Sequence, residues 1–177
     1  GVNRLSVGVQ SGNDEVLRSL GRRHTASDAR KTVEKARKIG FKNISVDIII
    51  GLPGEDTAEM LKSLDFALSL EPEHISAYML IIEPKTKLYF EGVSGADSEN
   101  TAKQYLALCD KLSEAGFRHY EISNFALPGF ESRHNLKYWR CREYLGIGPS
   151  AHSFISGKRF YYPEDLRGFI RSLKTVP

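Results

Sequence analysis

The sequence predicts an α/β fold built on parallel strands, and two observations support this prediction. Short apolar runs that favour strands alternate with longer amphipathic runs that favour helices, with strands recurring at intervals of about 30 to 40 residues. The succession of helix, glycine, phenylalanine and strand occurs twice, at Gly40-Phe41 and at Gly116-Phe117. Strands that are separated by helices pair in parallel through right-handed crossovers, so a segment of an α/β barrel or a doubly wound sheet is expected.

The first predicted strand covers residues 5–10, where apolar residues alternate with polar residues or glycine. The turn residues Ser11-Gly12-Asn13 then favour the start of a short helix that passes through Leu20. A longer helix is predicted between Thr25 and Gly40, because it begins with the pattern of a capping box and ends at a glycine.

The second predicted strand covers residues 44–50 and is apolar on both faces except for Ser45 and Asp47. A strand of this kind is typical of a parallel sheet that is covered by helices on both sides. We therefore expect helices on both faces of the sheet.

The remaining elements continue the same alternation. A helix is predicted for residues 56–68, a strand for 75–82, a helix for 102–115 and a strand for 117–122. From about Pro128 the periodicity is lost, and aromatic and polar residues become frequent. We predict two parts, an α/β segment at residues 1–127 and an irregular, aromatic-rich covering segment at residues 128–177 that leads toward a further domain.

Composition excludes several classes of function. The net charge of +3 comes from 25 basic and 22 acidic residues distributed along the chain, so no basic stripe for nucleic acid is expected. No apolar run approaches the roughly 20 residues that span a bilayer, and there is no signal peptide, which predicts a cytoplasmic protein. Cys109 and Cys141 have no spacing that favours a disulfide or a metal site, and Cys141 is expected to be a small packed thiol.

Polar residues mark the ends of the predicted strands, where parallel α/β folds bind their ligands. Asp47 lies within an apolar run, so its carboxylate requires a partner. A structural pair with Arg4 or Arg22 and a role in binding a ligand fit this pattern equally well. Gln10 and Arg22, taken alone, fit a loop stabiliser and a surface charge better than a binding site.

Three segments carry a resemblance to a known family: residues 1–11, residues 20–22 and residues 46–54, which read VDIIIGLPG. They resemble consecutive strand motifs of the oxygen-independent coproporphyrinogen III oxidase-like radical S-adenosylmethionine (SAM) proteins. The resemblance implies the C-terminal part of a partial (β/α)6 barrel with parallel strands.

The resemblance also implies cofactors. In this family a [4Fe–4S] cluster, held by the cysteines of a C-x3-C-x2-C motif, binds SAM, and reduction cleaves SAM to a deoxyadenosyl radical. The positions that match SAM-contacting residues of the family are Gln10, Arg22, Asp47 and Ile81. The cysteine motif has no counterpart here, so we expect a fragment that lacks the cluster-binding N-terminal part, holds no metal itself and is inactive alone.

The tail resembles the heme-chaperone branch of the family. Residues 133–139, RHNLKYW, resemble its HNxxYW signature, which makes His134, Asn135, Tyr138 and Trp139 candidates for binding heme or a porphyrin substrate. An imidazole can ligate heme iron while aromatic rings cover the porphyrin. The alternative is structural, with the polar residues capping a turn and the rings in a core.

Three functions follow for comparison. The first is a heme chaperone that binds heme and passes it to an acceptor protein. The second is an oxygen-independent coproporphyrinogen III oxidase, an enzyme that acts on a porphyrinogen substrate. The third is a nonradical α/β protein without a cofactor. A homodimer is compatible with each of them.

Overall fold

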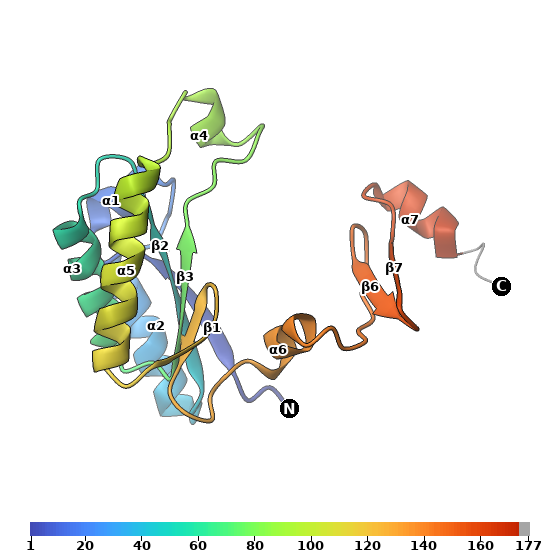
Figure 1. Ribbon diagram of the computed structural model, residues 1–177, viewed down its shortest axis with the longest axis horizontal. Helices are drawn as coiled ribbons and strands as arrows, with labels where there is room; N and C mark the ends of the chain where they lie inside the picture. The colour runs from blue at the N-terminus through green and yellow to red at the C-terminus, as the bar shows by residue number, and fades with distance from the viewer. Residues whose placement is uncertain (174–177) are drawn as a thin grey trace. The chain divides into compact units, whose positions relative to one another are not determined.

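The structure is a computed structural model that describes residues 1–173 (Figure 1). The chain divides into two compact units, Gly1–Glu131 and Ser132–Pro177, each of which has secondary structure of its own.

The first unit is built on a five-stranded sheet with the order β1-β2-β3-β5-β4. Strands β1, β2 and β3 pair in parallel, whereas β5 pairs antiparallel with both β3 and β4. The strands are β1 (Leu5–Gln10), β2 (Ile44–Ile50), β3 (His74–Met79), β4 (Arg118–Glu121) and β5 (Asn124–Ala126).

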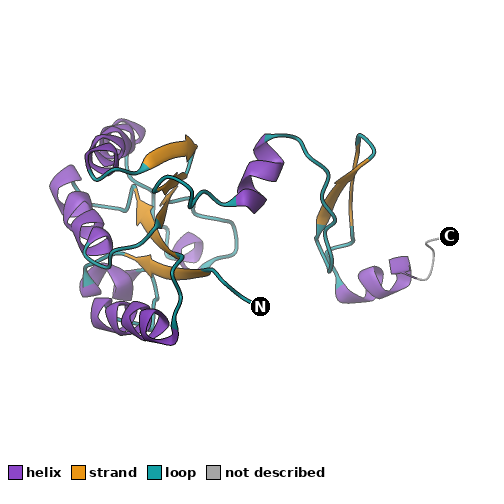
Figure 2. Cartoon of the chain, turned by 90° about the horizontal axis from the view of Figure 1, so that it is seen from below, coloured by secondary structure: helices purple, strands orange, loops and turns teal. Residues whose placement is uncertain are grey.

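Helices α1, α2, α3 and α5 lie against one face of this sheet (Figures 1 and 2). Helix α4 is a single turn in the segment between β3 and α5. The helices of this unit are α1 (Asp14–Ser19), α2 (Ala26–Ile39), α3 (Thr57–Leu68), α4 (Lys87–Phe90) and α5 (Ser98–Glu114).

The core lies between the sheet and these helices. Val46, Ile48 and Ile50 of β2 point to the helices and are at most 1% exposed. They pack in one cluster with Leu64 of α3 and Leu112 of α5, which are fully buried. The helices therefore cover only one of the two faces of the sheet.

The expectation of helices on both faces of the sheet is wrong for residues 1–131. The face opposite the helices carries Ser45 and Asp47 of β2, and their neighbours in register are Ser6 and Gly8 of β1. A strand of a barrel turns this second face toward the barrel axis, so the face can be polar without a second helix layer. We call it the polar face, and its residues on the three parallel strands are Ser6, Gly8, Ser45, Asp47, His74 and Ser76.

The strand predicted for residues 117–122 is in fact the first half of a hairpin. The chain turns at Ile122-Ser123, and β5 enters the sheet between β3 and β4. The Glu121 carboxylate accepts a hydrogen bond from the Ser123 amide at 3.2 Å and so stabilises the turn. Strand β3 ends at Met79, three residues before the predicted end, although one further ladder bond joins the Leu80 amide to the Ile50 carbonyl at 2.9 Å.

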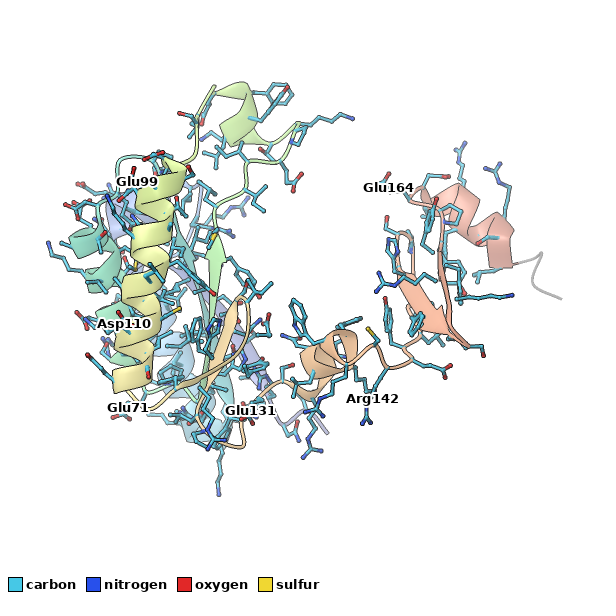
Figure 3. All side chains as sticks on the ribbon, in the orientation of Figure 1. Glu71, Glu99, Asp110, Glu131, Arg142 and Glu164 are labelled. Carbon is cyan, nitrogen blue, oxygen red and sulfur yellow. The ribbon has the colours of Figure 1, made fainter. Side chains whose placement is uncertain are left out.

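The second unit has more regular structure than the irregular segment that was expected. It contains α6 (Arg133–Trp139), a hairpin of β6 (His152–Ile155) and β7 (Lys158–Tyr161), and α7 (Leu166–Leu173). Figure 3 shows its side chains and labels Arg142 and Glu164. The hairpin turn is made by Ser156 and Gly157, which have φ angles of 51° and 74°. None of the helices within residues 1–173 has the length and apolar character needed to cross a membrane.

Candidate functional site

Gln10 and Asp47 lie on neighbouring strands of the parallel sheet, Gln10 at the end of β1 and Asp47 in the middle of β2. Asp47 is paired in register with Gly8, and Gln10 follows Gly8 across a β-bulge. Gln10 has a φ angle of 68°, a left-handed conformation that is uncommon for residues other than glycine. Such a conformation persists only where the surrounding fold holds it in place. Residues of this kind are frequent at functional sites.

Gly8 leaves room for the side chain of Gln10. A Cβ atom placed on Gly8 would lie 2.7 Å from the Gln10 Nε2 atom, which is closer than such atoms approach each other. The Gln10 amide therefore folds back over Gly8, onto the polar face and beside the strand that carries Asp47. The structure brings these two predicted site residues together.

The partner of Asp47 is a hydroxyl group rather than an arginine. Ser6 Oγ lies 3.0 Å from both carboxylate oxygens of Asp47 and donates to them. Arg4 donates instead to the Asn43 side chain at 3.3 Å and to the Phe130 carbonyl at 3.0 Å. Asp47 is only partly buried, so its carboxylate can accept further hydrogen bonds from a ligand.

A buried chain of hydrogen bonds lies at the opposite end of the polar face. His74 is 1% exposed, and its ring joins Ser45 Oγ at 2.7 Å to Tyr120 Oη at 2.7 Å. Burial and, secondarily, the positive charge of Arg4 lower the pKa of His74 from 6.5 to about 3. His74 is therefore neutral at physiological pH and links β2, β3 and β4.

Arg22 and Ile81 lie on loops at the same end of the sheet as Gln10. Arg22 follows α1 and is exposed, while its backbone amide donates to the Leu17 carbonyl at 2.9 Å. Ile81 follows β3 and is 75% exposed. Both residues are accessible to a ligand above the strand ends.

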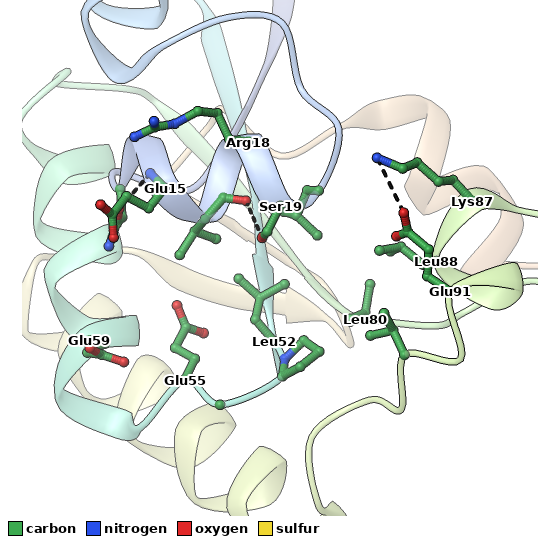
Figure 4. A pocket seen from close by; sticks show the side chains of 16 residues that line it. Glu15, Arg18, Ser19, Leu52, Glu55, Glu59, Leu80, Lys87, Leu88 and Glu91 are labelled. Atoms are coloured by element: carbon green, nitrogen blue, oxygen red, sulfur yellow. Dashed lines mark hydrogen bonds and ion pairs between the residues drawn. The ribbon is translucent and has the colours of Figure 1, made fainter.

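A groove of about 630 Å³ lies at this end of the first unit (Figure 4). It is bounded by α1, by the loop that precedes α3, and by α4. Figure 4 shows the Glu55 carboxylate turned into the groove. Glu55 is 6% exposed, and within residues 1–173 its Oε2 atom has no hydrogen-bond partner. Burial first, and then the nearby charges of Glu59 and Asp56, raise the pKa of Glu55 from 4.5 to about 7.

The candidates for heme binding lie on α6 in the second unit. His134 and Tyr138 are one helical turn apart, with Tyr138 Oη and His134 Nε2 at 2.9 Å and their ring centres at 4.9 Å. The Tyr138 ring contacts Tyr144 edge to face at a centre-to-centre distance of 4.5 Å. His134 is exposed, so its imidazole is accessible.

The other two candidates on α6 differ in exposure. Trp139 is 53% exposed, so it is not a core residue. Asn135 is half-buried, and its backbone amide donates to the Ser132 hydroxyl at 3.4 Å, which caps the helix. Cys141 is exposed with a φ angle of 47°, and the expectation of a packed thiol is therefore wrong.

Three features of the first unit were not predicted from the sequence: the space left by Gly8, the burial of His74 and the burial of Glu55. Gly8 could have been identified, because a glycine inside a strand often marks a close approach. The burial of His74 and of Glu55 has no such signal, since it depends on residues 45 to 49 positions away in the sequence, namely Tyr120, Asn100 and Gln104.

The residues present do not form a site for an iron–sulfur cluster. The only two cysteines are Cys109, on α5, and Cys141, in the second unit. Within residues 1–173, no three histidine, cysteine, aspartate or glutamate side chains are arranged to hold a metal ion. The residues that fit a cofactor are the polar groups at the strand ends, which suit the hydroxyl, amino and carboxylate groups of SAM.

Comparison with known proteins finds related sequences. Residues 1–67 match the Radical SAM superfamily. The chain is 45% identical over 163 residues to the heme chaperone HemW of Bacillus subtilis (strain 168), covering 90% of this chain and 43% of that protein. It is 44% identical over 156 residues to the radical S-adenosyl methionine domain-containing protein 1, mitochondrial, of Bos taurus, covering 86% of this chain and 35% of that protein. The chain thus spans less than half the length of these relatives.

A solved structure has the same fold. Coproporphyrinogen III oxidase (HemN) from Escherichia coli, a radical SAM enzyme, matches with a TM-score of 0.80 at 22% identity, covering 98% of this chain and 44% of that chain. This confirms the predicted α/β fold with parallel strands as part of a radical SAM barrel. Residues 1–67 thus match a radical SAM domain, and the chain is a homologue of part of the proteins named heme chaperone HemW, with the fold of coproporphyrinogen III oxidase (HemN).

Proposed function

We propose that this chain is part of a heme chaperone, a protein that binds heme and passes it to an acceptor protein. The observation that supports this most directly is α6, where the accessible His134 imidazole is packed against Tyr138. The relatives named heme chaperone HemW from Bacillus subtilis and Lactococcus lactis, which match 90% and 98% of this chain, support the same function. The acceptor protein, a cytoplasmic location and formation of a homodimer belong to this proposal.

Gln10, Arg22, Asp47 and Ile81 are proposed to bind SAM. The Asp47 carboxylate and the Gln10 amide can bond the ribose hydroxyls, and the Arg22 guanidinium suits the methionyl carboxylate. Ile81 would lie beside the adenine. SAM supplies a deoxyadenosyl radical when a [4Fe–4S] cluster reduces it, and in this proposal the cluster is held by residues of the full-length protein outside these 177.

His134 is proposed to ligate heme iron through its imidazole, while Tyr138 and Trp139 cover the porphyrin. In the structure the His134 Nε2 atom is bonded to the Tyr138 hydroxyl. Iron binding at Nε2 therefore requires the Tyr138 hydroxyl to move, whereas binding at Nδ1 would leave this bond intact. Asn135 holds the start of α6 through its backbone and is proposed to contact the heme edge.

The test is a heme titration of the full-length protein, followed by the Soret absorbance. We expect His134→Ala to weaken heme binding by about tenfold or more, because one axial bond to iron is lost. His152→Ala is the matched control, since His152 is also exposed in the second unit and is also stacked on a tyrosine, Tyr161, at 5.2 Å. Unchanged binding by His134→Ala would exclude the ligand role.

A second candidate function is the oxygen-independent oxidation of coproporphyrinogen III, which is favoured by the fold shared with coproporphyrinogen III oxidase (HemN). An anaerobic assay of the full-length, cluster-reconstituted protein with coproporphyrinogen III separates the two. Turnover of this substrate would contradict the chaperone proposal.

A further inference from the structure

Four cationic side chains gather at α6 and the turn that follows it. Arg133, Lys137, Arg140 and Arg142 line a groove of about 260 Å³ together with Leu136. Residues 133, 137 and 140 share one face of the helix, since they are four and three positions apart. The Arg142 amide donates to the Lys137 carbonyl at 2.9 Å, which holds the fourth residue next to this face. We call this groove the basic groove.

In the part of the chain that the structure describes, no carboxylate neutralises the charges of the basic groove. Within residues 1–173, none of its four cations lies within 4.0 Å of a carboxylate oxygen. Glu143, the acidic residue next to Arg142 in the sequence, accepts a hydrogen bond from the Ser156 amide at 2.5 Å. Residues 132–173 hold eight Lys and Arg against three Asp and Glu, although the whole chain has a net charge of only +3.

The stability of α6 does not explain all of these charges. Cations near the C-terminus of a helix interact favourably with its dipole, which accounts for Lys137 in the last turn and for the C-cap residue Arg140. Arg133 lies in the first turn, where a cation is unfavourable, and this turn contains no acidic residue. A bound anion would compensate for this arrangement.

An aromatic surface adjoins the basic groove on the same seven-residue helix. His134 and Tyr138 are the next residues along α6 after Arg133 and Lys137. The aromatic contacts continue from Tyr138 to Tyr144 at 4.5 Å and from Tyr144 to Phe154 at 6.5 Å between ring centres. One short segment therefore combines an imidazole, an extended row of rings and a cluster of cations.

We propose that the basic groove binds the two propionate carboxylates of the porphyrin whose iron is held at His134. This inference rests on the proposed heme-binding function and adds the groups that select a porphyrin with free carboxylates. Heme has an apolar macrocycle, a metal centre and two carboxylates, and each of these has a counterpart on or beside α6. The side chains of the basic groove are exposed, so each ion pair contributes modestly and is screened by salt.

The test compares heme with heme dimethyl ester, which keeps the iron and the macrocycle but has no carboxylate charge. Both are titrated into the full-length protein and into the variant Lys137→Gln/Arg140→Gln. The matched control is Lys158→Gln/Arg167→Gln, which removes the same two charges from exposed positions of the second unit outside the groove. Thermal unfolding of each variant checks that the fold is kept.

We expect Lys137→Gln/Arg140→Gln to weaken heme binding by about tenfold and to leave binding of the ester unchanged, since two exposed ion pairs are lost. The control variant should bind both ligands as the unchanged protein does. An equal loss in the control, an equal loss for the ester, or no loss for heme would each overturn the inference.

A measurement on the unchanged protein covers the case in which the variant fails to fold. Raising the salt concentration should weaken binding of heme and have little effect on the ester, and equal salt dependence would contradict the inference. If the unchanged protein binds neither ligand, the proposed function itself fails. His134→Ala could abolish heme binding while neither Lys137→Gln/Arg140→Gln nor salt weakens it. In that case the proposed heme binding stands, and only the role of the basic groove is wrong.

Discussion

At the scale of single residues, the position of the Gln10 amide depends on the absence of a side chain at Gly8. The amide nitrogen lies where a Cβ of residue 8 would clash with it, at 2.7 Å. Residue 8 has an ordinary backbone conformation for a strand, because its φ angle is not positive. A methyl group here would therefore displace the flexible amide and not the strand.

We predict that Gly8→Ala lowers the affinity for SAM by about two- to tenfold in the full-length protein, which corresponds to the loss of one hydrogen bond. Equilibrium dialysis with SAM measures the effect. In a Gln10→Ala background the same substitution should cause no further loss, since the group that it displaces is absent. If the losses of SAM affinity caused by Gly8→Ala and Gln10→Ala add in the double variant, Gly8 affects SAM binding independently of Gln10.

The sequence was sufficient to predict that the Asp47 carboxylate has a partner, but not which residue that partner is. A carboxylate in an apolar strand is visible in the sequence, and the structure places it on the polar face as a partly buried acceptor. The two arginines considered as partners are replaced by Ser6, because parallel pairing puts Ser6 and Asp47 on the same face of adjacent strands. Register between strands is not encoded in either strand alone, so this contact could not be predicted.

At the scale of secondary-structure elements, α2 is the helix whose limits the sequence predicts best. The Thr25 side chain accepts from the Asp28 amide at 3.1 Å, and Asp28 Oδ2 accepts from the Thr25 amide at 3.0 Å, as the capping-box pattern predicted. Gly40 ends the helix with a φ angle of 107°. The local sequence determines both ends, so tertiary contacts are not needed to predict them.

Two threonines of α2 provide a matched test of this capping. Thr25→Ala should lower the free energy of unfolding by about 1 kcal/mol, because the first turn loses its cap. Thr32→Ala should leave it unchanged or raise it slightly, since Thr32 is exposed within the helix and its hydroxyl bonds back to the Asp28 carbonyl at 2.8 Å. Urea unfolding with an unchanged m-value measures both. Equal losses for the two variants would show that the cap contributes nothing specific.

Strand β5 shows where prediction of elements fails. Residues 117–126 contain no glycine or proline, so only the weaker turn residues Ser123 and Asn124 mark the turn at Ile122-Ser123. The turn is stabilised by the Glu121 carboxylate and by the bond from the Ala77 amide to the Ser123 carbonyl at 2.8 Å. The second of these bonds joins residues 46 positions apart, and such a contact has no trace in the local sequence.

At the scale of the whole molecule, charge is divided unequally between the two units. The first 131 residues hold 16 Lys and Arg against 19 Asp and Glu, whereas residues 132–173 hold eight against three. The small net charge of +3 is thus the sum of an acidic and a basic part. The expectation of evenly distributed charge is wrong, because the net charge of the whole chain hides the difference between the two units. Net charge counted separately for each unit shows that the second unit is basic.

The stability of the first unit is expected to vary with pH because of two buried groups, Glu55 and His74, which change it in opposite directions. Glu55 has a pKa raised from 4.5 to about 7, so between these values the unfolded chain has lost a proton that the folded chain keeps. Its contribution to stability is lost as the pH rises through this range. His74 has a pKa lowered from 6.5 to about 3, so its contribution is lost as the pH falls from 6.5 toward 3. Between about pH 4.5 and 6.5 the two effects oppose each other.

Replacing either group should therefore reveal the pH dependence of the other. Between pH 4.5 and 6.5 the free energy of unfolding of Glu55→Gln should rise, relative to the unchanged chain, by on the order of 1 kcal/mol per pH unit. That of His74→Gln should fall by a similar amount over the same range. Urea unfolding at several pH values measures both, with Glu15→Gln as the control because Glu15 is exposed at the same groove and is not among the charges that raise the pKa of Glu55. A Glu55→Gln difference that does not vary with pH would mean that the pKa of the Glu55 carboxyl is not raised in the folded chain.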